Sequence, residues 1–140
     1  MVMPAPLEVV RDFVNSEASG ESLAVREAIR ALLRANNGVD VPVTEPTRVL
    51  DQAAHRVRLQ IGFMDGGLQF VAGERSRVAR VLEAVAVAMA DDSWPRLKAC
   101  RADDCQWAFV DHARNRSRHW CDMAICGNRA KAQRFRERHA

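Results

Sequence analysis

Long apolar runs are absent from this 140-residue sequence. No stretch approaches the roughly 18 to 20 apolar residues that span a bilayer. The first fifteen residues, MVMPAPLEVVRDFVN, also lack the basic segment and the following apolar segment of a secretory signal. We therefore predict a cytoplasmic protein without membrane contact, in which cysteines stay reduced.

Catalytic motifs are absent as well. The sequence has no H-E-x-x-H pair, no glycine-rich phosphate loop and no serine within a nucleophile motif. Gly66-Gly67 is better explained as part of a turn. These absences predict that the protein is not an enzyme.

Charge is divided unevenly along the chain. Residues 1–95 hold ten arginines and thirteen acidic residues, a net charge of −3, whereas residues 96–140 hold eleven lysines and arginines and five acidic residues, a net charge of +6. The segment DDSWP at 91–95 interrupts a helical pattern, so we place a domain boundary there. A basic second domain favours a polyanionic partner, although differences of this size also arise by chance on solvated surfaces.

The first domain, residues 1–95, is predicted to be mostly helical. Apolar residues recur at helical spacing from Leu7 to Val14 and from Val25 to Leu33, where Asn36-Asn37-Gly38 ends the pattern. A third apolar stripe runs from Val78 to Met89 and begins after Ser76, a residue type that caps helices.

The middle of this domain has a different pattern. Residues 39–46 contain two prolines and are expected to form a loop, followed by a short helix at 47–55. Apolar residues then alternate over 57–63 and again over 68–72, with Asp65-Gly66 between the two runs. This pattern predicts a β-hairpin with a tight turn.

All four cysteines lie in the second domain, residues 96–140, and are Cys100, Cys105, Cys121 and Cys126. Their spacing, C-x4-C-x15-C-x4-C, supplies two pairs of thiolates joined by a loop. Four thiolates complete the tetrahedral shell of zinc and leave no open position, so the pattern predicts a structural zinc site.

Three alternatives use the same part of the chain. Two disulfides are disfavoured by the missing secretory signal, and an iron–sulfur cluster is disfavoured by the paired spacing in basic surroundings. In the third alternative, His112 or His119 replaces one cysteine as a ligand.

The residues around the cysteines favour a small zinc-dependent module. Trp107 and Phe109 alternate as in a strand that packs on the metal site, and both Trp107 and Trp120 are expected to fill the core. A helix is expected to begin near Gly127, with Phe135 as its anchor. The predicted fold is therefore α+β and mostly helical, with one β-hairpin in the first domain and a treble-clef-like zinc finger in the second.

The segment LKACRADDCQWAFVDHARNRSRHWCDMAICGNRAKAQRFRERH resembles the CGNR zinc finger, a family named for the residues that here are Cys126-Gly127-Asn128-Arg129. The resemblance covers about residues 96–139. Upstream, VVRDFVNSEAS resembles more loosely the start of the ABATE domain, which precedes this finger in bacterial proteins. The resemblance implies a bacterial protein with a zinc-bound finger, transcription regulation through DNA binding, and an N-terminal domain that senses a signal or small ligand.

Eight cations are predicted to contact nucleic acid, because guanidinium and ammonium groups pair with phosphates. They are Arg114, Arg116, Arg118, Arg129, Lys131, Arg134, Arg136 and Arg138. The helix that carries most of them is slim enough for a major groove, where Asn128 and Gln133 are residue types that read adenine. Alternatively, Asn128 and Arg129 hydrogen-bond the cysteine sulfurs and orient the site.

Three polar residues of the first domain also stand out. We expect Asp12 and Asn15 to brace a neighbouring element, with a ligand contact as the alternative; His55 is the third.

The sequence as a whole predicts a zinc-dependent, DNA-binding transcription regulator whose N-terminal domain senses a signal or dimerises. The alternative is a zinc-stapled adaptor that binds protein or RNA. The sequence leaves open whether the first domain binds a small-molecule ligand and whether the protein forms a homodimer.

Overall fold

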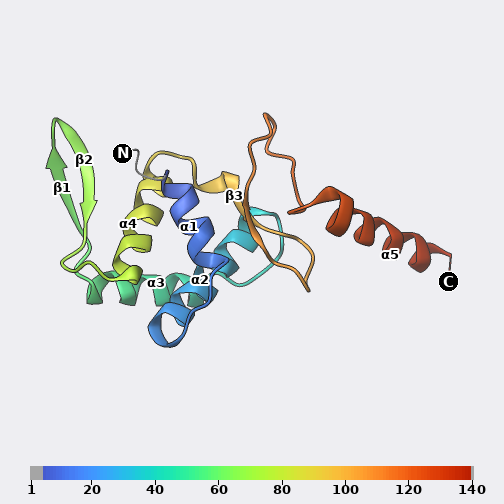
Figure 1. Ribbon diagram of the computed structural model, residues 1–140, viewed down its shortest axis with the longest axis horizontal. Coiled ribbons are helices and arrows are strands. Elements are labelled where there is room, and N and C mark those ends of the chain that lie inside the picture. The colour runs from blue at the N-terminus through green and yellow to red at the C-terminus, as the bar shows by residue number, and fades with distance from the viewer. Residues whose placement is uncertain (1–4, 140) are drawn as a thin grey trace.

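The computed structural model describes residues 5–139, so residues 1–4 of the predicted first domain and residue 140 of the predicted finger lie outside the described part. The molecule has a body of four helices, a β-hairpin that projects at one end, and a helix, α5 (Asn128–Arg138), that extends at the other (Figure 1). Within the described residues the strands form two separate two-stranded sheets. This arrangement confirms the predicted α+β, mostly helical class.

The body consists of α1 (Pro6–Val14), α2 (Gly20–Asn36), α3 (Thr44–Arg56) and α4 (Arg77–Ala90). Pro6 is the first residue of α1. Its lack of an N–H costs no hydrogen bond there, because N–H groups of the first turn have no partner within the helix. The Ser76 hydroxyl accepts a hydrogen bond of 3.1 Å from the Ala79 N–H and so caps α4 as predicted. Among the helices that residues 5–139 form, none combines the length and the apolar composition needed to cross a membrane.

The prediction of a loop at residues 39–46 is wrong for residues 44–46, because α3 already begins at Thr44. Pro46 lies in the first turn of α3, where backbone N–H groups have no partner within the helix. A proline at this position therefore does not interrupt the helix. The helix predicted at 47–55 is confirmed and extends further in both directions.

Apolar side chains of α1, α2 and α4 form the main core. Its fully buried members include Val10, Val14, Val25, Ile29, Leu33 and Val81. All six lie in the stripes that helical spacing predicts. Burying each such side chain contributes roughly 1.5 to 3 kcal/mol, so these stripes account for much of the packing energy of the body.

The main core continues beyond residue 95 into a second hairpin. Strand β3 (Leu97–Ala99) pairs antiparallel with β4 (Ala108–Val110); β3 packs on α2, and β4 packs on α1. The core residues of this hairpin are Leu97, Ala99, Ala108 and Val110. The change in composition at residue 95 is therefore not matched by a break in packing, and the division into 1–95 and 96–140 stays a prediction.

The hairpin predicted before α4 is confirmed. Strand β1 (Gln60–Met64) pairs antiparallel with β2 (Gly67–Val71). Asp65 and Gly66 form the tight turn, with positive φ angles of 53° and 76°. Residues that flank the two strands pack against the main core, whereas the strands themselves are largely exposed and project from the body (Figure 1).

Asn15 joins the end of α1 to β4. Its side-chain amide donates to the Ala108 carbonyl at 2.9 Å, and its Oδ1 accepts from the Ala108 N–H at 2.8 Å. These two bonds pair backbone groups of β4 that a third strand would otherwise have to satisfy. The prediction that Asn15 braces a neighbouring element is confirmed, whereas Asp12 is exposed and its side chain hydrogen-bonds, among residues 5–139, with the adjacent Arg11 alone.

Replacing Asn15→Ala should lower the free energy of unfolding by about 1 to 3 kcal/mol, because both backbone groups of Ala108 lose their partner. The exposed Asp12→Ala variant is the matched control on the same helix and should change stability by less than about 0.5 kcal/mol. Urea denaturation of the metal-loaded protein measures both. Equal effects of the two changes would show that the amide does not hold β4.

Candidate metal centre

The four cysteines lie on two tight turns of the backbone. Cys100 follows β3 and its N–H donates to the Trp107 carbonyl at 2.8 Å, while the Cys105 N–H donates to the Ala102 carbonyl at 3.0 Å. Cys121 precedes a single wide helical turn, η2 (Met123–Gly127), and Cys126 lies within it; η2 leads directly into α5. The first cysteine turn is thus the loop that connects β3 to β4, and the last cysteine lies in η2 just before α5.

The four sulfur atoms all lie within 4.8 Å of one another. Cys121 Sγ is 3.5 Å from Cys105 Sγ and 3.7 Å from Cys126 Sγ. Sulfur atoms bound to one tetrahedral ion at about 2.3 Å would be about 3.8 Å apart. The side chains are thus already arranged around the position that a single metal ion would take.

Two of the alternatives for this site do not agree with its geometry. All four cysteines are free, and the sulfur separations of 3.5 and 3.7 Å are far longer than the roughly 2.05 Å of a disulfide bond. His119 Nδ1 lies 3.0 Å from Asn37 Oδ1, and the cluster of ligand atoms found in residues 5–139 contains cysteines alone. The disulfide and histidine-ligand alternatives are therefore wrong.

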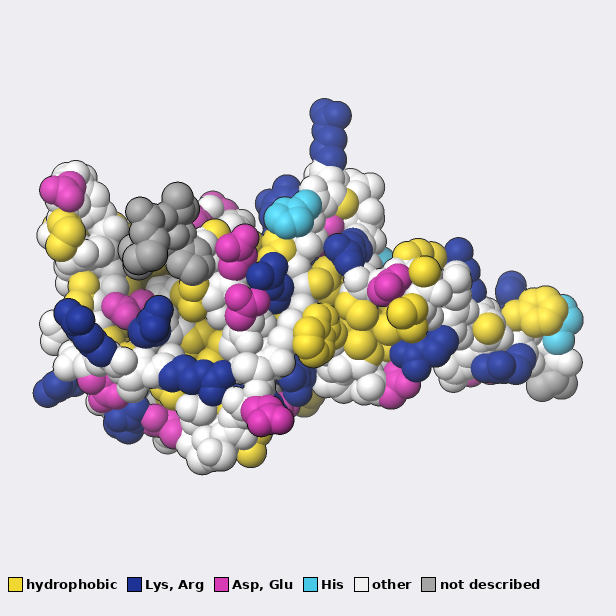
Figure 2. Space-filling model, in the orientation of Figure 1, with side chains coloured by type: hydrophobic (Ala, Val, Ile, Leu, Met, Phe, Trp, Pro, Cys, Tyr) yellow, Lys and Arg dark blue, Asp and Glu magenta, His cyan; other side chains and the backbone are white. Residues whose placement is uncertain are grey.

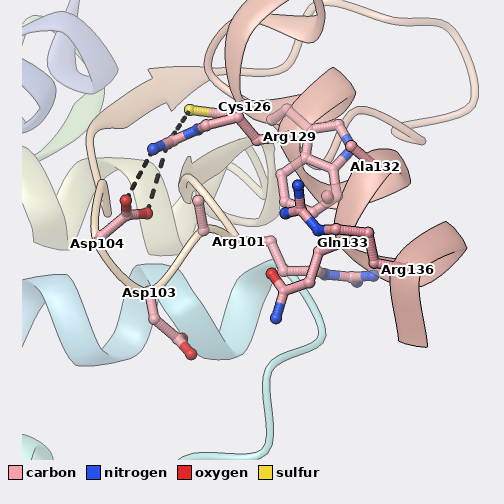
Figure 3. A pocket seen from close by; sticks show the side chains of 11 residues that line it. Arg101, Asp103, Asp104, Cys126, Arg129, Ala132, Gln133 and Arg136 are labelled. Carbon is pink, nitrogen blue, oxygen red and sulfur yellow. Dashed lines mark hydrogen bonds and ion pairs between the residues drawn. The ribbon is translucent and has the colours of Figure 1, made fainter. Parts of the chain in front are cut away.

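Arg129 connects the last cysteine to the first turn (Figure 3). Its Nη2 donates to Cys126 Sγ at 3.4 Å, and its Nη1 lies 2.7 Å from Asp104 Oδ2. This is the sulfur-orienting role considered for Arg129 from the sequence. Asn128 does not share it: its side-chain amide donates to the Ala124 carbonyl at 3.1 Å, so the expected contact of Asn128 with sulfur is wrong.

The thiol groups differ in how easily they ionise. Burial raises the pKa of Cys105 and of Cys121. Burial also acts to raise the pKa of Cys126, but hydrogen bonds from Arg129 and the neighbouring thiols outweigh it and leave that pKa below its ordinary value. Cys126 therefore forms a thiolate more readily than Cys105 and Cys121, and a bound cation would favour the thiolate form of those two.

Aromatic residues lie differently from the sequence-based expectation. Phe109 and Trp120 pack against the cysteine cluster. Trp107, in contrast, is 53% exposed, so its expected place in the core is wrong. The prediction that Phe135 anchors the helix is also wrong, because Phe135 is 56% exposed and stacks on His139, with ring centroids 4.1 Å apart. Helix α5 has no buried residue and is held at its start.

Asn37, at the end of α2, holds both cysteine-bearing segments. Its buried amide donates to the Ala99 carbonyl at 2.9 Å and to the His119 carbonyl at 2.8 Å, and its Oδ1 lies 3.0 Å from His119 Nδ1. Ala99 precedes Cys100, and His119 shortly precedes Cys121. One side chain thus fixes the two halves of the metal site relative to the helical body. The sequence indicates only that Asn37 ends a helix.

Lys98 and Asp111 form a buried ion pair that sequence reasoning missed. Lys98 Nζ lies 2.8 Å from Asp111 Oδ2 and also donates to the carbonyls of Arg116 and Arg118, at 2.7 and 2.8 Å. A buried pair is tolerated when its remaining hydrogen-bonding positions are filled in this way. The pair holds the basic loop after β4 against the finger. Its only signal in the sequence is a lysine within the otherwise apolar strand β3.

The eight predicted nucleic-acid contacts fall into two groups. Arg118 donates to the Trp120 carbonyl at 3.0 Å and lies over the Phe109 ring, and Arg129 is held by sulfur and Asp104. The other six are exposed, and none of them has an ion-pair partner among residues 5–139. They are Arg114, Arg116, Lys131, Arg134, Arg136 and Arg138. Figure 2 shows lysine and arginine side chains distributed along the α5 end of the molecule.

The polar residues singled out in the first domain lie apart from the cysteines. His55 is exposed and contacts Asp51 on its own helix. Asp12 lines an open cavity of about 320 Å³, together with Phe13 and three arginines of the α4 start. The structure therefore brings together the four cysteines and Arg129, but not Asp12, Asn15 or His55.

A four-cysteine centre with two tight turns and a helix after the last ligand defines a metal-stabilised finger. Residues 96–139 match the family model described as the CGNR zinc finger, which confirms the resemblance carried by Cys126-Gly127-Asn128-Arg129. No curated protein matches the chain. The family match covers the finger, and the resemblance of the first domain to the ABATE domain stays a prediction.

We expect about one metal ion per chain in protein purified without a tag, because four thiolates complete one shell. Removing the ion with a chelator should release residues from about 121 onward, while the main core, which includes β3 and β4, stays folded. Elemental analysis and limited proteolysis with mass spectrometry measure the two effects. A protease-resistant C-terminal segment after complete removal of the ion would contradict this expectation.

Arg129→Ala should weaken metal binding by about 10- to 100-fold, as loss of a residue that orients a ligand typically does. Arg134→Ala removes the same charge from an exposed position of the same helix and should leave metal affinity unchanged. Competition with a chromophoric chelator gives both affinities. If the two variants bind metal equally, the contact between Arg129 and Cys126 has no role in the site.

Proposed function

We propose that this protein is a zinc-dependent, DNA-binding transcription regulator in which α5 contacts the duplex. The observation that carries the proposal is the exposed cationic helix that begins at a four-cysteine centre. Zinc is the metal proposed because it accepts four thiolates in a closed tetrahedral shell and because residues 96–139 match a zinc finger family. A closed shell leaves no position for substrate, so the proposed role of the ion is structural.

The shape and exposure of α5 support a groove-binding role. Its 11 residues give a length of about 16 Å, and every residue from Lys131 to His139 is exposed. Such a helix projects from the body without being covered by it (Figure 1). A major groove about 12 Å wide admits a single helix, so α5 has suitable dimensions.

Most of the charge of α5 is not neutralised by residues 5–139. Lys131, Arg134, Arg136 and Arg138 have no ion-pair partner in the described residues 5–139. The only acidic residue of α5, Glu137, accepts a hydrogen bond from Gln133 at 3.3 Å. Four thiolates and one Zn²⁺ would carry a net charge of about −2, which reduces the +6 of the finger to about +4. A positive surface therefore remains for phosphate contacts.

Base reading would fall to residues in the middle and second half of α5. Gln133 and Arg136 line an open cavity of about 520 Å³ between α5 and the first cysteine turn (Figure 3). Glutamine is a residue type that reads adenine, and arginine reads guanine. Asn128 and Arg129 are held by contacts within the finger, so Gln133 and Arg136 are the better candidates.

The first domain supplies the regulatory part of the proposal. Its open cavity beside α4 combines the apolar wall of Phe13 and Val81 with three arginines, Arg75, Arg77 and Arg80, and one carboxylate, Asp12. A small anionic ligand with an apolar part would suit this combination. Sensing through this cavity and dimerisation are both compatible with the proposed regulator.

A zinc-stapled adaptor for protein or RNA is the second candidate, because the finger exposes apolar side chains. Trp107, Met123 and Ile125 are 53%, 49% and 59% exposed. Exposed aromatic residues can stack on unpaired bases, and apolar groups of this size can bind a protein surface. The adaptor would use this surface rather than the cations of α5.

Arg134→Ala should weaken binding to every duplex sequence and reduce the slope of log affinity against log salt by about 0.9, the value for one lost phosphate contact. Arg80→Ala, an exposed arginine on α4, is the matched control and should leave the slope unchanged. Fluorescence anisotropy of zinc-loaded protein with labelled duplexes measures both. If the protein shows no salt-dependent binding to any duplex at low ionic strength, the regulator proposal fails and the adaptor becomes the leading candidate.

A further inference from the structure

The open cavity of about 520 Å³ between α5 and the first cysteine turn, residues 100–105, has arginines on two sides (Figure 3). Arg101 lines it from the turn, and Arg136 lines it from α5, together with Gln133. Arg101 lies outside the basic loop and α5, which hold all eight cations predicted to contact nucleic acid. Guanidinium groups that face one cavity from two elements form a site for an anion.

The two carboxylates of this cavity are already paired. Asp104 Oδ2 lies 2.7 Å from Arg129 Nη1, and Asp103 Oδ1 lies 2.8 Å from Arg34 Nη2 of α2. Each carboxylate charge is therefore compensated by an arginine of its own. Neither of them neutralises the remaining cations of the cavity.

Arg101 is held in place by the body but is only partly bonded. Its backbone N–H donates to the His119 carbonyl at 3.0 Å, and its Nη2 donates to the Asn37 carbonyl at 2.6 Å. Its Nε has no hydrogen-bond partner, and neither Arg101 nor Arg136 has an ion-pair partner, among residues 5–139. A guanidinium that is fixed in position and keeps free donors binds a phosphate with little loss of conformational entropy.

Helical spacing divides the side chains of α5 between two opposite faces, because residues three or four apart lie on the same side of a helix. The face toward the cavity consists of Arg129, Ala132, Gln133 and Arg136. The opposite face carries Lys131, Arg134 and Arg138. A helix in a major groove has one sugar-phosphate strand on each side, so each face of α5 would meet a different strand.

We propose that the cavity holds one strand of a bound duplex and that Arg101 contacts a phosphate of that strand. This inference rests on the proposed DNA contact of α5 and adds the first cysteine turn to the DNA-binding surface. The strand lies between Arg101 and α5, with its base edges toward Gln133 and Arg136. The cations of the opposite face of α5 contact the second strand.

The proposed contact also affects the position of α5. Helix α5 has no buried residue and is held at its start, whereas Arg101 is bonded to the body through Asn37 and His119. A strand that contacts Arg101 on one side and α5 on the other connects the helix to the body. Binding of a duplex therefore fixes the direction of α5.

The test is duplex binding by the zinc-loaded full chain over a salt series. Arg101→Gln should weaken binding to every duplex sequence and reduce the slope of log affinity against log salt by about 0.9, the value for one lost phosphate contact. Arg101→Lys keeps the charge and should keep the slope. Arg58→Gln is the matched control, because Arg58 Nη2 also donates to a backbone carbonyl, that of Gly73 at 3.0 Å, but just before β1; its slope should not change.

Elemental analysis and circular dichroism of each variant control for the metal and the fold, because Arg101 also bonds Asn37. If the wild type binds duplexes and Arg101→Gln keeps the full slope, the inference is wrong while the proposed function stands. Equal loss of slope in Arg101→Gln and Arg101→Lys would also overturn it, because the role of Arg101 would then be structural. A wild type that binds no duplex contradicts the proposed function itself.

A second measurement uses the wild type alone and so does not depend on the folding of a variant. Phenylglyoxal modifies accessible arginines, and mass spectrometry locates the modified positions. A bound duplex should protect Arg101, whereas Arg75 of the first domain is exposed and should react equally with and without the duplex. Equal modification of Arg101 in both states would contradict the proposed contact.

Discussion

Four cysteine sulfur atoms held within 4.8 Å of one another are the constraint on which the C-terminal part of the chain depends. Thiolates this close together repel one another unless a cation lies between them. Helix α5 has no buried residue, so its position follows from Cys126 at its start and from the contact of Arg129 with Cys126 and Asp104. The metal centre therefore determines both where the cationic helix begins and in which direction it leaves the finger.

The helical body supports this centre through side-chain amides as well as through apolar packing. Asn15 pairs with both backbone groups of Ala108, and Asn37 bonds the segments that precede Cys100 and Cys121. Because an amide offers donors and an acceptor in one plane, each can replace part of a missing strand. The Lys98–Asp111 pair adds a third buried polar contact, which holds the basic loop. These contacts make the finger and the body parts of one packed structure.

The two ends of the molecule expose different kinds of side chain. At one end α5 exposes four cations, Lys131, Arg134, Arg136 and Arg138, that have no ion-pair partner among residues 5–139, and at the other end the hairpin exposes apolar side chains with almost no charge. Cations favour a polyanion and exposed apolar surface favours a protein partner, so the two ends suit different kinds of partner. The body between them contains the cavity proposed for a ligand, beside the start of α4.

The sequence by itself determined the helices, the hairpin and the set of metal ligands. Helical spacing and alternation reflect which side of an element can be buried, and four paired cysteines are recognisable from ligand chemistry alone. Tertiary structure decided the exposure of Trp107 and Phe135, the use of Arg118 and Arg129 inside the finger, and the role of Asn37. It also decided that the hairpin's apolar face stays uncovered. These properties depend on which surfaces meet across long separations in the chain, and a local pattern carries no information about that.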